Sequence, residues 1–208
     1  MKTEESSPEI PGGYHAGSRE LQDHFDSRRI ADRLEDVNAR AIFTEGDRAF
    51  ISAASMFFLA TANEEGWPEC SYKGGLPGFV RVTDECSLAF PDYDGNGMFR
   101  SLGNVSVNPR VGLLFVNFEK PSRLRLNGLA SVHLTDPLLD EFPGAQCIVR
   151  VRAERIFPNC PRYIHRMQLV QHSVYAPGPG LTPPEPDWKH NPQYADALPK
   201  RLNSAPES

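Results

Sequence analysis

The stretch MFFLATANEEGWPECSYKG (residues 56–74) decides the fold of this chain. Its two ends, MFFLATA (56–62) and PECSYKG (68–74), are short runs rich in aromatic and small apolar residues, and the Glu65-Gly66 pair between them signals a turn. Two extended runs joined by a short turn predict a pair of antiparallel β-strands.

Similar runs follow along the chain, separated by further turn signals such as Pro77-Gly78 and Asp84-Glu85. The five that follow are GFVRVTD (78–84), CSLAFP (86–91), RVGLLFVNF (110–118), RLRLNGLASVHL (123–134) and CIVRVRAERIF (147–157). Six or seven short strands at this spacing predict a mainly β fold, an antiparallel barrel or sandwich with flanking helices.

Alternation within the later strands separates an apolar from a polar face. Leu124 and Leu126 point one way, whereas Arg123 and Arg125 point the other. The last strand repeats the pattern and adds three more arginines, so these two strands together predict a local cationic surface in an acidic protein. The three are Arg150, Arg152 and Arg155.

Helical periodicity precedes the strands. Apolar residues between Arg19 and Val37 recur every three to five positions and predict two short amphipathic helices, the second beginning at Arg28 after a cap at Asp26-Ser27. Thr44 is a good N-cap for a third helix over EGDRAFISAAS (45–55). A short helix is also expected over RYIHRMQ (162–168).

We therefore expect three parts: an N-terminal extension with short helices (1–45), a barrel domain (46–175) and a proline-rich tail (176–208). A net charge of −5 and a pI near 5.7 argue against binding to nucleic acid. The N-terminus lacks the apolar core of a secretory signal, and no apolar run is long enough to span a membrane, so a cytoplasmic protein without membrane contact is expected.

Cysteine spacing gives no sign of a metal site. The four cysteines form no C-x-x-C pair and the histidines are not clustered, so neither bound zinc nor a disulfide framework is expected. No order of residues typical of a hydrolase stands out, and no catalytic residue is assigned. Cys160 and His165, in NCPRYIHR (159–166), are noted without a role.

The stretch FPDYDGNGMFRSLGN (90–104) joins a glycine-containing turn to a predicted helix over residues 97–107. Backbone amides around Asn96 at a helix N-terminus, with Arg100 in the first turn, are the usual ingredients of a phosphate site. Alternatively, Gly95 and Gly97 supply positive φ for a tight turn and Arg100 is a solvated helix residue.

The stretch ECSYKGG (69–75) offers a second polar group. Ser71 and Lys73 lie on the same face of the predicted strand, from which the lysine could reach a phosphate or a ring carbonyl. The competing interpretation is a lysine on an edge strand that discourages aggregation.

From about Ala49 to Val132, this succession of elements resembles the FMN-binding split barrel of the pyridoxamine 5'-phosphate oxidase family, in its oxidase-like group. The resemblance rests on the strand ending at Lys73 and on the helix followed by NPRV (108–111). It implies a split barrel, bound FMN and a homodimer with the cofactor at the interface.

The resemblance also implies which residues bind FMN. It assigns Lys73 and Arg100 to the flavin phosphate, and the hydroxyls of Ser71 and Ser101 with the amides around Asn96 are expected to complete the phosphate site. Backbone at Phe90, Pro91 and Asp92 is expected near the flavin ring, and Arg123 or Arg125 near the polar edge of that ring.

At the flavin site the sequence departs from the family pattern: Pro68 stands where the family has an arginine, Phe99 and Ser101 replace two members of a Ser-Arg-Lys triplet, and Arg123 replaces a glutamine. The residues that bind pyridoxamine phosphate in that family, on a further helix and in an Arg-x-His ending, have no counterpart here, which argues against vitamin B6 chemistry. We therefore expect an FMN-dependent oxidoreductase acting on another small molecule. The alternatives are a flavin carrier or sensor without turnover and a haem-binding split barrel, for which His165 and His172 are the candidate ligands.

Overall fold

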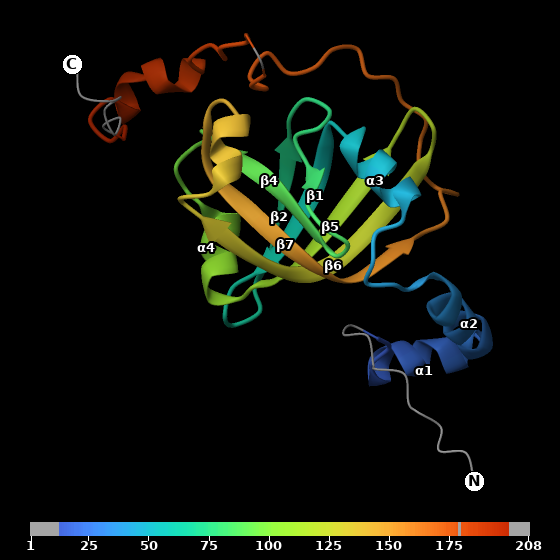
Figure 1. The fold of residues 1–208 in the computed structure, drawn as a ribbon. Coiled ribbons are helices and arrows are strands. Elements are labelled where there is room, and N and C mark those ends of the chain that lie inside the picture. The colour runs from blue at the N-terminus through green and yellow to red at the C-terminus, as the bar shows by residue number, and fades with distance from the viewer. Residues whose placement is uncertain (1–12, 179, 200–208) are drawn as a thin grey trace.

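The computed structural model describes residues 13–178 and 180–199. Seven strands form one antiparallel sheet in the order β2-β1-β5-β6-β7-β4-β3, which curls into a split barrel (Figure 1). The strands are β1 (Met56–Ala62), β2 (Pro68–Gly74), β3 (Arg81–Val82), β4 (Ser87–Tyr93), β5 (Arg110–Asn117), β6 (Ser122–His133) and β7 (Ala145–Pro158). The mainly β fold and the strand pair that opens the sheet are confirmed.

The helices flank this sheet. They are α1 (Ala16–His24), α2 (Arg28–Asn38), α3 (Glu45–Ser52), α4 (Arg100–Val107) and the short 3-10 helices η1 (Pro137–Glu141), η2 (Asp187–His190) and η3 (Pro192–Tyr194). Helices α1 and α2 lie to one side of the barrel, and the C-terminal segment runs along its top edge toward η2 (Figure 1). No helix among the described residues is long and apolar enough to cross a membrane.

Phenylalanine rings fill the interior of the barrel. Phe57 is fully buried, and its ring centroid lies 4.9 Å from that of Phe90, 5.1 Å from that of Phe115 and 5.9 Å from that of Phe79. Because side chains alternate along a strand, Phe57, Phe90 and Phe115 define the inward face of β1, β4 and β5, and Phe79 packs against them from the segment before β3. The same alternation sends Phe58, Leu114 and Arg125 to the outward face.

Helix α3 is fixed by a buried carboxylate. Thr44 caps it as predicted, since its Oγ1 accepts a hydrogen bond of 3.1 Å from the Asp47 amide, while Asp47 accepts bonds of 2.8 Å from the Thr44 amide and hydroxyl. Arg40 adds a bond of 2.6 Å from its Nη2 to Asp47 Oδ1. The helix is thereby tied to the segment that precedes it.

Asp47 is expected to make stability depend on pH. Burial alone would raise the pKa of its carboxyl, but hydrogen bonds from Arg40 and Thr44 outweigh burial and hold the pKa below its ordinary value. Because the folded-state pKa is depressed, this stabilisation is complete above the unfolded-state pKa of about 3.9 and is lost as pH falls through the folded-state value. Asp47→Asn should lower the free energy of unfolding at pH 7 by about 2 kcal/mol and weaken the acid dependence.

Urea unfolding at pH 7 and at lower pH measures this effect. Glu45→Gln is the matched control, because Glu45 lies in the first turn of the same helix with a side chain that is 96% exposed. Equal unfolding free energies for wild type and Asp47→Asn at pH 7 would contradict the prediction.

Some elements differ from the sequence prediction. Strand β3 keeps only Arg81 and Val82 of the predicted run over 78–84. Helix α4 begins at Arg100 and not at residue 97, because Gly97 and Phe99 have φ angles of 73° and 46°, outside the helical region. Ser27 is the N-cap residue of α2, but its side chain makes no capping bond.

The predicted helix over 162–168 is wrong. Ile164 closes a turn onto the Pro161 carbonyl, and the amide of Met167 then donates to the Phe118 carbonyl at 3.0 Å. The amide of Leu169 likewise donates to the Glu119 carboxylate at 3.2 Å. The amides of Met167 and Leu169 therefore donate hydrogen bonds to the β5–β6 turn and not to carbonyls one helical turn earlier.

Candidate functional site

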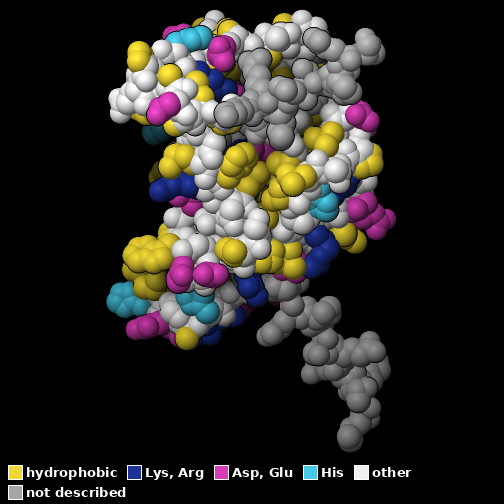
Figure 2. Space-filling model, turned by 90° about the vertical axis from the view of Figure 1, so that its left-hand side faces the viewer, with side chains coloured by type: hydrophobic (Ala, Val, Ile, Leu, Met, Phe, Trp, Pro, Cys, Tyr) yellow, Lys and Arg dark blue, Asp and Glu magenta, His cyan; other side chains and the backbone are white. Residues whose placement is uncertain are grey.

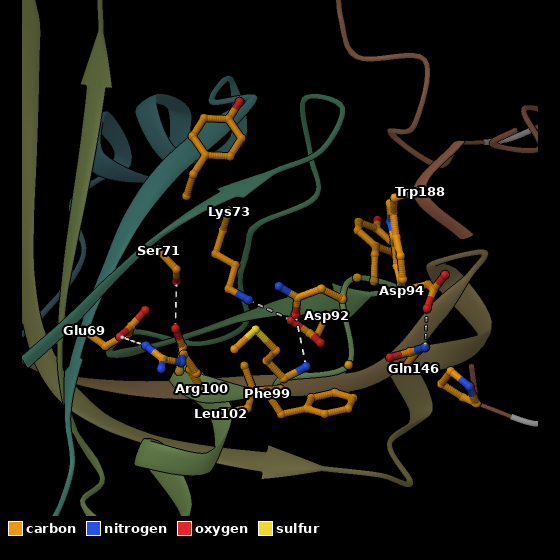
Figure 3. A pocket seen from close by; sticks show the side chains of 18 of the residues that line it. Glu69, Ser71, Lys73, Asp92, Asp94, Phe99, Arg100, Leu102, Gln146 and Trp188 are labelled. Carbon is orange, nitrogen blue, oxygen red and sulfur yellow. Dashed lines mark hydrogen bonds and ion pairs between the residues drawn. The ribbon is translucent and has the colours of Figure 1, made fainter. Parts of the chain in front are cut away.

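A pocket of about 460 Å³ opens between β2, the end of β4, the N-terminus of α4 and the C-terminal segment (Figure 3). Its lining residues are Glu69, Ser71, Tyr72, Lys73, Asp92, Tyr93, Asp94, Gly95, Asn96, Gly97, Met98, Phe99, Arg100, Ser101, Leu102, Gln146, Trp188, Lys189 and Pro199. This volume falls within the range of small-molecule sites in proteins, about 300–1,000 Å³.

Strand β2 supplies one wall. Glu69, Ser71 and Lys73 are paired in register with Thr61, Leu59 and Phe57, whose side chains are buried on the inward face of β1. In an antiparallel pair, residues opposite each other point to the same side, so the three polar groups face the barrel opening. The prediction that Ser71 and Lys73 share one strand face is confirmed.

Helix α4 supplies the opposite wall. Phe99, its N-cap residue, adopts the left-handed conformation and has no side chain that can accept a hydrogen bond from the first turn. Asn96 instead accepts a bond of 3.0 Å from the Met98 amide within the preceding loop. The first-turn amides of α4, from Arg100 to Leu102, thus have no side-chain cap and belong to residues that line the pocket.

Hydroxyl groups join the two walls. The Ser101 hydroxyl donates to the Ser71 hydroxyl at 3.0 Å, close to the start of α4 (Figure 3). Behind them, the side-chain Nδ2 of Asn104 donates a hydrogen bond of 3.1 Å to Thr61 Oγ1, which fixes α4 against β1. The helix therefore presents its N-terminus to the pocket from a firmly bonded position.

Both cations at this end carry carboxylate partners. Lys73 Nζ lies 2.8 Å from Asp92 Oδ1, and both side chains are largely buried, whereas Arg100 lies 3.5 Å from Glu69 and is 65% exposed. Among the described lining residues, Lys73, Arg100 and Lys189 balance Glu69, Asp92 and Asp94. The described lining therefore has no net positive charge, in contrast to the basic pocket expected from the sequence, and this end of the pocket offers directed hydrogen-bond donors.

The structure brings six predicted site residues together and separates four others. Ser71, Lys73, Asp92, Asn96, Arg100 and Ser101 all line the pocket. Phe90 is instead fully buried in the core, and Pro91 is buried beside it in β4. Neither residue lines the pocket, because β4 reaches the barrel opening only at Asp92. Their expected contact with the flavin ring concerned the backbone and stays a prediction.

Arg123 and Arg125 also lie elsewhere. They alternate with the buried Leu124 and Leu126 and so occupy the outward face of β6, where Arg125 stands 6.0 Å over the ring of Phe157. Their assignment to the cofactor site is not supported within this chain.

The cationic surface expected from five arginines is largely neutralised. Arg150 binds Asp136 at 2.7 Å, Arg152 binds Glu154 at 2.9 Å, and Arg155 pairs with Glu35 of α2. Three of the five arginines therefore serve as ion-pair partners within the fold.

Several lining residues were missed from the sequence. Glu69 could have been found, because it shares the alternation of Ser71 and Lys73. Asp94, just after β4, accepts a bond of 3.4 Å from Gln146 of β7, and Trp188 and Lys189 come from the C-terminal segment. No local pattern links these positions to the pocket.

Burial keeps two titratable side chains near the pocket, Tyr93 and Cys147, in their neutral forms. Burial raises the pKa of Tyr93, so its phenol keeps its proton at pH 7. Burial, and then the negative charge of Asp92, raise the pKa of Cys147 to about 11, which leaves no thiolate behind the pocket. The site can donate and accept hydrogen bonds, but the described lining residues do not form an activated nucleophile.

Seen from the α4 side, the surface carries hydrophobic side chains across its middle, with charged groups toward the edges (Figure 2). Met98 and Phe99, at the approach to α4, are 59% and 51% exposed. Two apolar side chains therefore lie next to the uncapped backbone amides of α4 at the mouth of the pocket.

A second cavity of about 400 Å³ lies between α3, the β5–β6 turn and residues 167–172. It is mostly apolar, with Phe50, Met56 and Phe118 in its wall, and His172 also lines it. His165 and Cys160 are exposed and line neither cavity. In the described part of the chain, no group of three or more histidine, cysteine or acidic side chains is placed to hold a metal ion.

The fold and pocket define a split-barrel protein with a pocket lined by hydrogen-bond donors beside the edge strand β2. Residues 43–165 match the family model for pyridoxamine 5'-phosphate oxidase, and since this match spans more than half of the chain, the protein belongs to that family. No curated protein sequence matches it.

Solved structures with a similar fold include three bacterial proteins. One, from Lactobacillus delbrueckii and provisionally assigned as a pyridoxamine 5'-phosphate oxidase, is 19% identical, with 58% of this chain and 99% of that chain covered and a TM-score of 0.48. An FMN-binding protein of Syntrophomonas wolfei is 11% identical, with 68% and 96% covered and a TM-score of 0.41. HutZ, the haem storage protein of Vibrio cholerae, is 18% identical, with 54% and 87% covered and a TM-score of 0.37. At such identities the likeness concerns fold alone.

Proposed function

We propose that this protein is an FMN-binding flavoprotein whose main pocket holds the cofactor phosphate at the N-terminus of α4. The observation that carries the proposal is the uncapped first turn of α4, which meets the hydroxyls of Ser71 and Ser101 and the cations of Lys73 and Arg100 in one pocket. Backbone amides at a helix N-terminus, together with arginine and hydroxyl donors, suit a phosphate dianion.

The residues present fit FMN as a whole. The α4 end supplies donors for the phosphate, while Asp92 supplies an acceptor for the hydroxyl groups of the ribityl chain. The apolar and aromatic side chains of Met98 and Phe99 offer surface to a ring system. When bound, the flavin supplies hydride and electron transfer, and the protein supplies its position and electrostatic surroundings.

Arg100 rearranges most easily when a phosphate enters. Its guanidinium is largely exposed and only 3.5 Å from Glu69, so it can leave this partner at little cost. Lys73 is held more firmly by Asp92, and it can donate a second bond while the first remains, because an ammonium group has three donors. A phosphate is therefore bound mainly by Arg100, the hydroxyls and the amides, with Lys73 as a fixed charge.

Arg100→Ala is expected to weaken FMN binding by about 1.5–3 kcal/mol, the range for a hydrogen bond to a charged group. Isothermal titration of the apoprotein with FMN measures the change. Arg110→Ala is the matched control, because Arg110 is an exposed arginine just beyond the other end of α4 and does not line the pocket. An affinity equal to that of wild type would remove Arg100 from the site.

The oxidoreductase part of the proposal concerns turnover. Family membership supports it, and the lack of a counterpart for the family's pyridoxamine-phosphate-binding helix residues and Arg-x-His ending favours another substrate. Anaerobic mixing with NADH, NADPH or a chemically reduced deazaflavin, followed by absorption of the bound flavin, tests it. Bleaching by one donor and reoxidation by an acceptor indicate an enzyme, whereas a cofactor that no donor reduces indicates a carrier or sensor.

We further propose a homodimer built on the outward face of the sheet. Phe58 and Leu114 are only half-buried there, and Tyr72 beside them is 63% exposed. Adjacent apolar and aromatic side chains that remain exposed on one face are typical of a protein–protein interface. Light scattering after gel filtration measures the mass, and a monomer at micromolar concentration would contradict this part.

A further inference from the structure

The C-terminal segment returns to the pocket from the far side of the molecule. The chain leaves β7, passes along the top edge of the barrel and places η2 near the end of β4 (Figure 1). Trp188 and Lys189, both in η2, line the pocket, and Trp188 stands at the end opposite Arg100 (Figure 3). We call residues 187–190 the strap.

Side-chain contacts hold the strap in place. Lys189 Nζ forms an ion pair with Asp94 Oδ2, and Asp94 also accepts a bond of 3.4 Å from Gln146. The Lys189 side chain is only 17% exposed, although it carries a charge. Its ammonium lies 5.8 Å from the centroid of the Trp188 ring, and Tyr194 meets the same ring edge-on at 6.3 Å.

The two ends of the pocket differ in chemistry. The α4 end offers hydroxyls, amides and cations, whereas the strap end offers an indole ring beside a carboxylate and an amide. A ligand with a phosphate at one end and a planar aromatic ring system at the other satisfies both. FMN has this form.

We infer that Trp188 contacts the ring system of the bound cofactor, and that the strap, fastened by the Lys189–Asp94 pair, slows release of the cofactor. The inference rests on the proposed FMN site. Trp188 then acts as a ligand-binding residue, while Asp94 and Lys189 position it.

The first test compares two tryptophan variants. Trp188→Leu should release FMN about three to ten times faster than wild type, as expected for loss of an aromatic contact. An indole in contact with a flavin quenches the flavin emission, so emission from bound FMN should also rise in this variant. Trp67→Leu is the matched control, because Trp67 is 75% exposed in the β1–β2 turn and lies outside the pocket.

The second test exchanges the charges of the fastening pair. Lys189→Glu places two carboxylates together and should speed FMN release about two- to fivefold. The double variant Asp94→Lys with Lys189→Glu restores an opposite pair and should bring the rate back toward wild type. A merely structural role for either residue would not give this rescue.

The outcomes separate the strap from the FMN proposal. FMN binding with a release rate and emission unchanged by Trp188→Leu overturns the strap and leaves the FMN site standing. Faster release in Trp188→Leu, together with no rescue by the charge exchange, retains Trp188 as a contact and overturns the fastening pair. If wild-type protein binds no FMN, both the proposed function and the strap are wrong.

Discussion

FMN is expected to bind about 100 to 700 times more tightly than riboflavin, which differs from it only by lacking the phosphate. Hydrogen bonds to a charged group contribute about 1.5–3 kcal/mol each. Part of this gain is offset by the ion pairs that already exist. Arg100 loses its ion pair with Glu69 when it binds the phosphate, and Lys73 interacts with the phosphate while it remains paired with Asp92. We therefore expect a net difference of about 3–4 kcal/mol, which corresponds to the stated ratio.

Titration calorimetry with the two ligands measures this ratio directly. In the double variant Lys73→Gln with Arg100→Gln, the amides and hydroxyls at α4 remain, so the ratio should fall to about tenfold. Inorganic phosphate should compete with FMN, but hardly with riboflavin. Lys73→Gln leaves the carboxylate of Asp92 without its cation and could destabilise the protein. Thermal melting followed by circular dichroism therefore checks that the double variant is folded. Equal affinity for FMN and riboflavin in wild type would show that α4 does not bind the phosphate.

The second large effect concerns the core. Phe57→Ala should lower the free energy of unfolding by about 3–5 kcal/mol, because a fully buried ring packed against Phe79, Phe90 and Phe115 leaves a cavity that the barrel cannot close. Urea unfolding at pH 7 measures it. Phe58→Ala is the matched control: Phe58 is the next residue on β1, but it points to the outward face and is half-buried, so a smaller loss is expected. Equal losses in the two variants would contradict the inward and outward assignment.

Most strands could be predicted because their signal is local. The boundaries of β1 and β2 agree with the predicted runs, since aromatic and branched side chains end at clear turn residues there. The capping box of Thr44 and Asp47 is likewise encoded within four residues. The same locality placed Ser71 and Lys73 on one face, and Arg100 in the first turn of α4.

What escaped prediction depends on contacts between distant parts of the chain. The pairing of Lys73 with Asp92 joins two strands at opposite ends of the sheet order, and only closure of the barrel brings them together. Sequence alternation places Phe90 and Asp92 on one face of β4 but does not show how deep each lies. The Phe90 side chain lies in the core, and of the two residues only Asp92 lines the pocket. The position of Trp188 in the pocket could not be predicted, because a proline-rich segment has no periodicity that indicates which surface it contacts.

The absorption spectrum of the purified protein tests the central claim most directly. After incubation with FMN and gel filtration, wild type should keep the two visible bands of oxidised flavin, and the Lys73→Gln with Arg100→Gln variant should lose most of them. A Soret band in the protein as purified would instead favour haem, with His172 in the second cavity as the first ligand to replace. A wild-type protein that emerges without flavin bands, or a folded double variant that keeps them in full, would contradict an FMN phosphate site at α4.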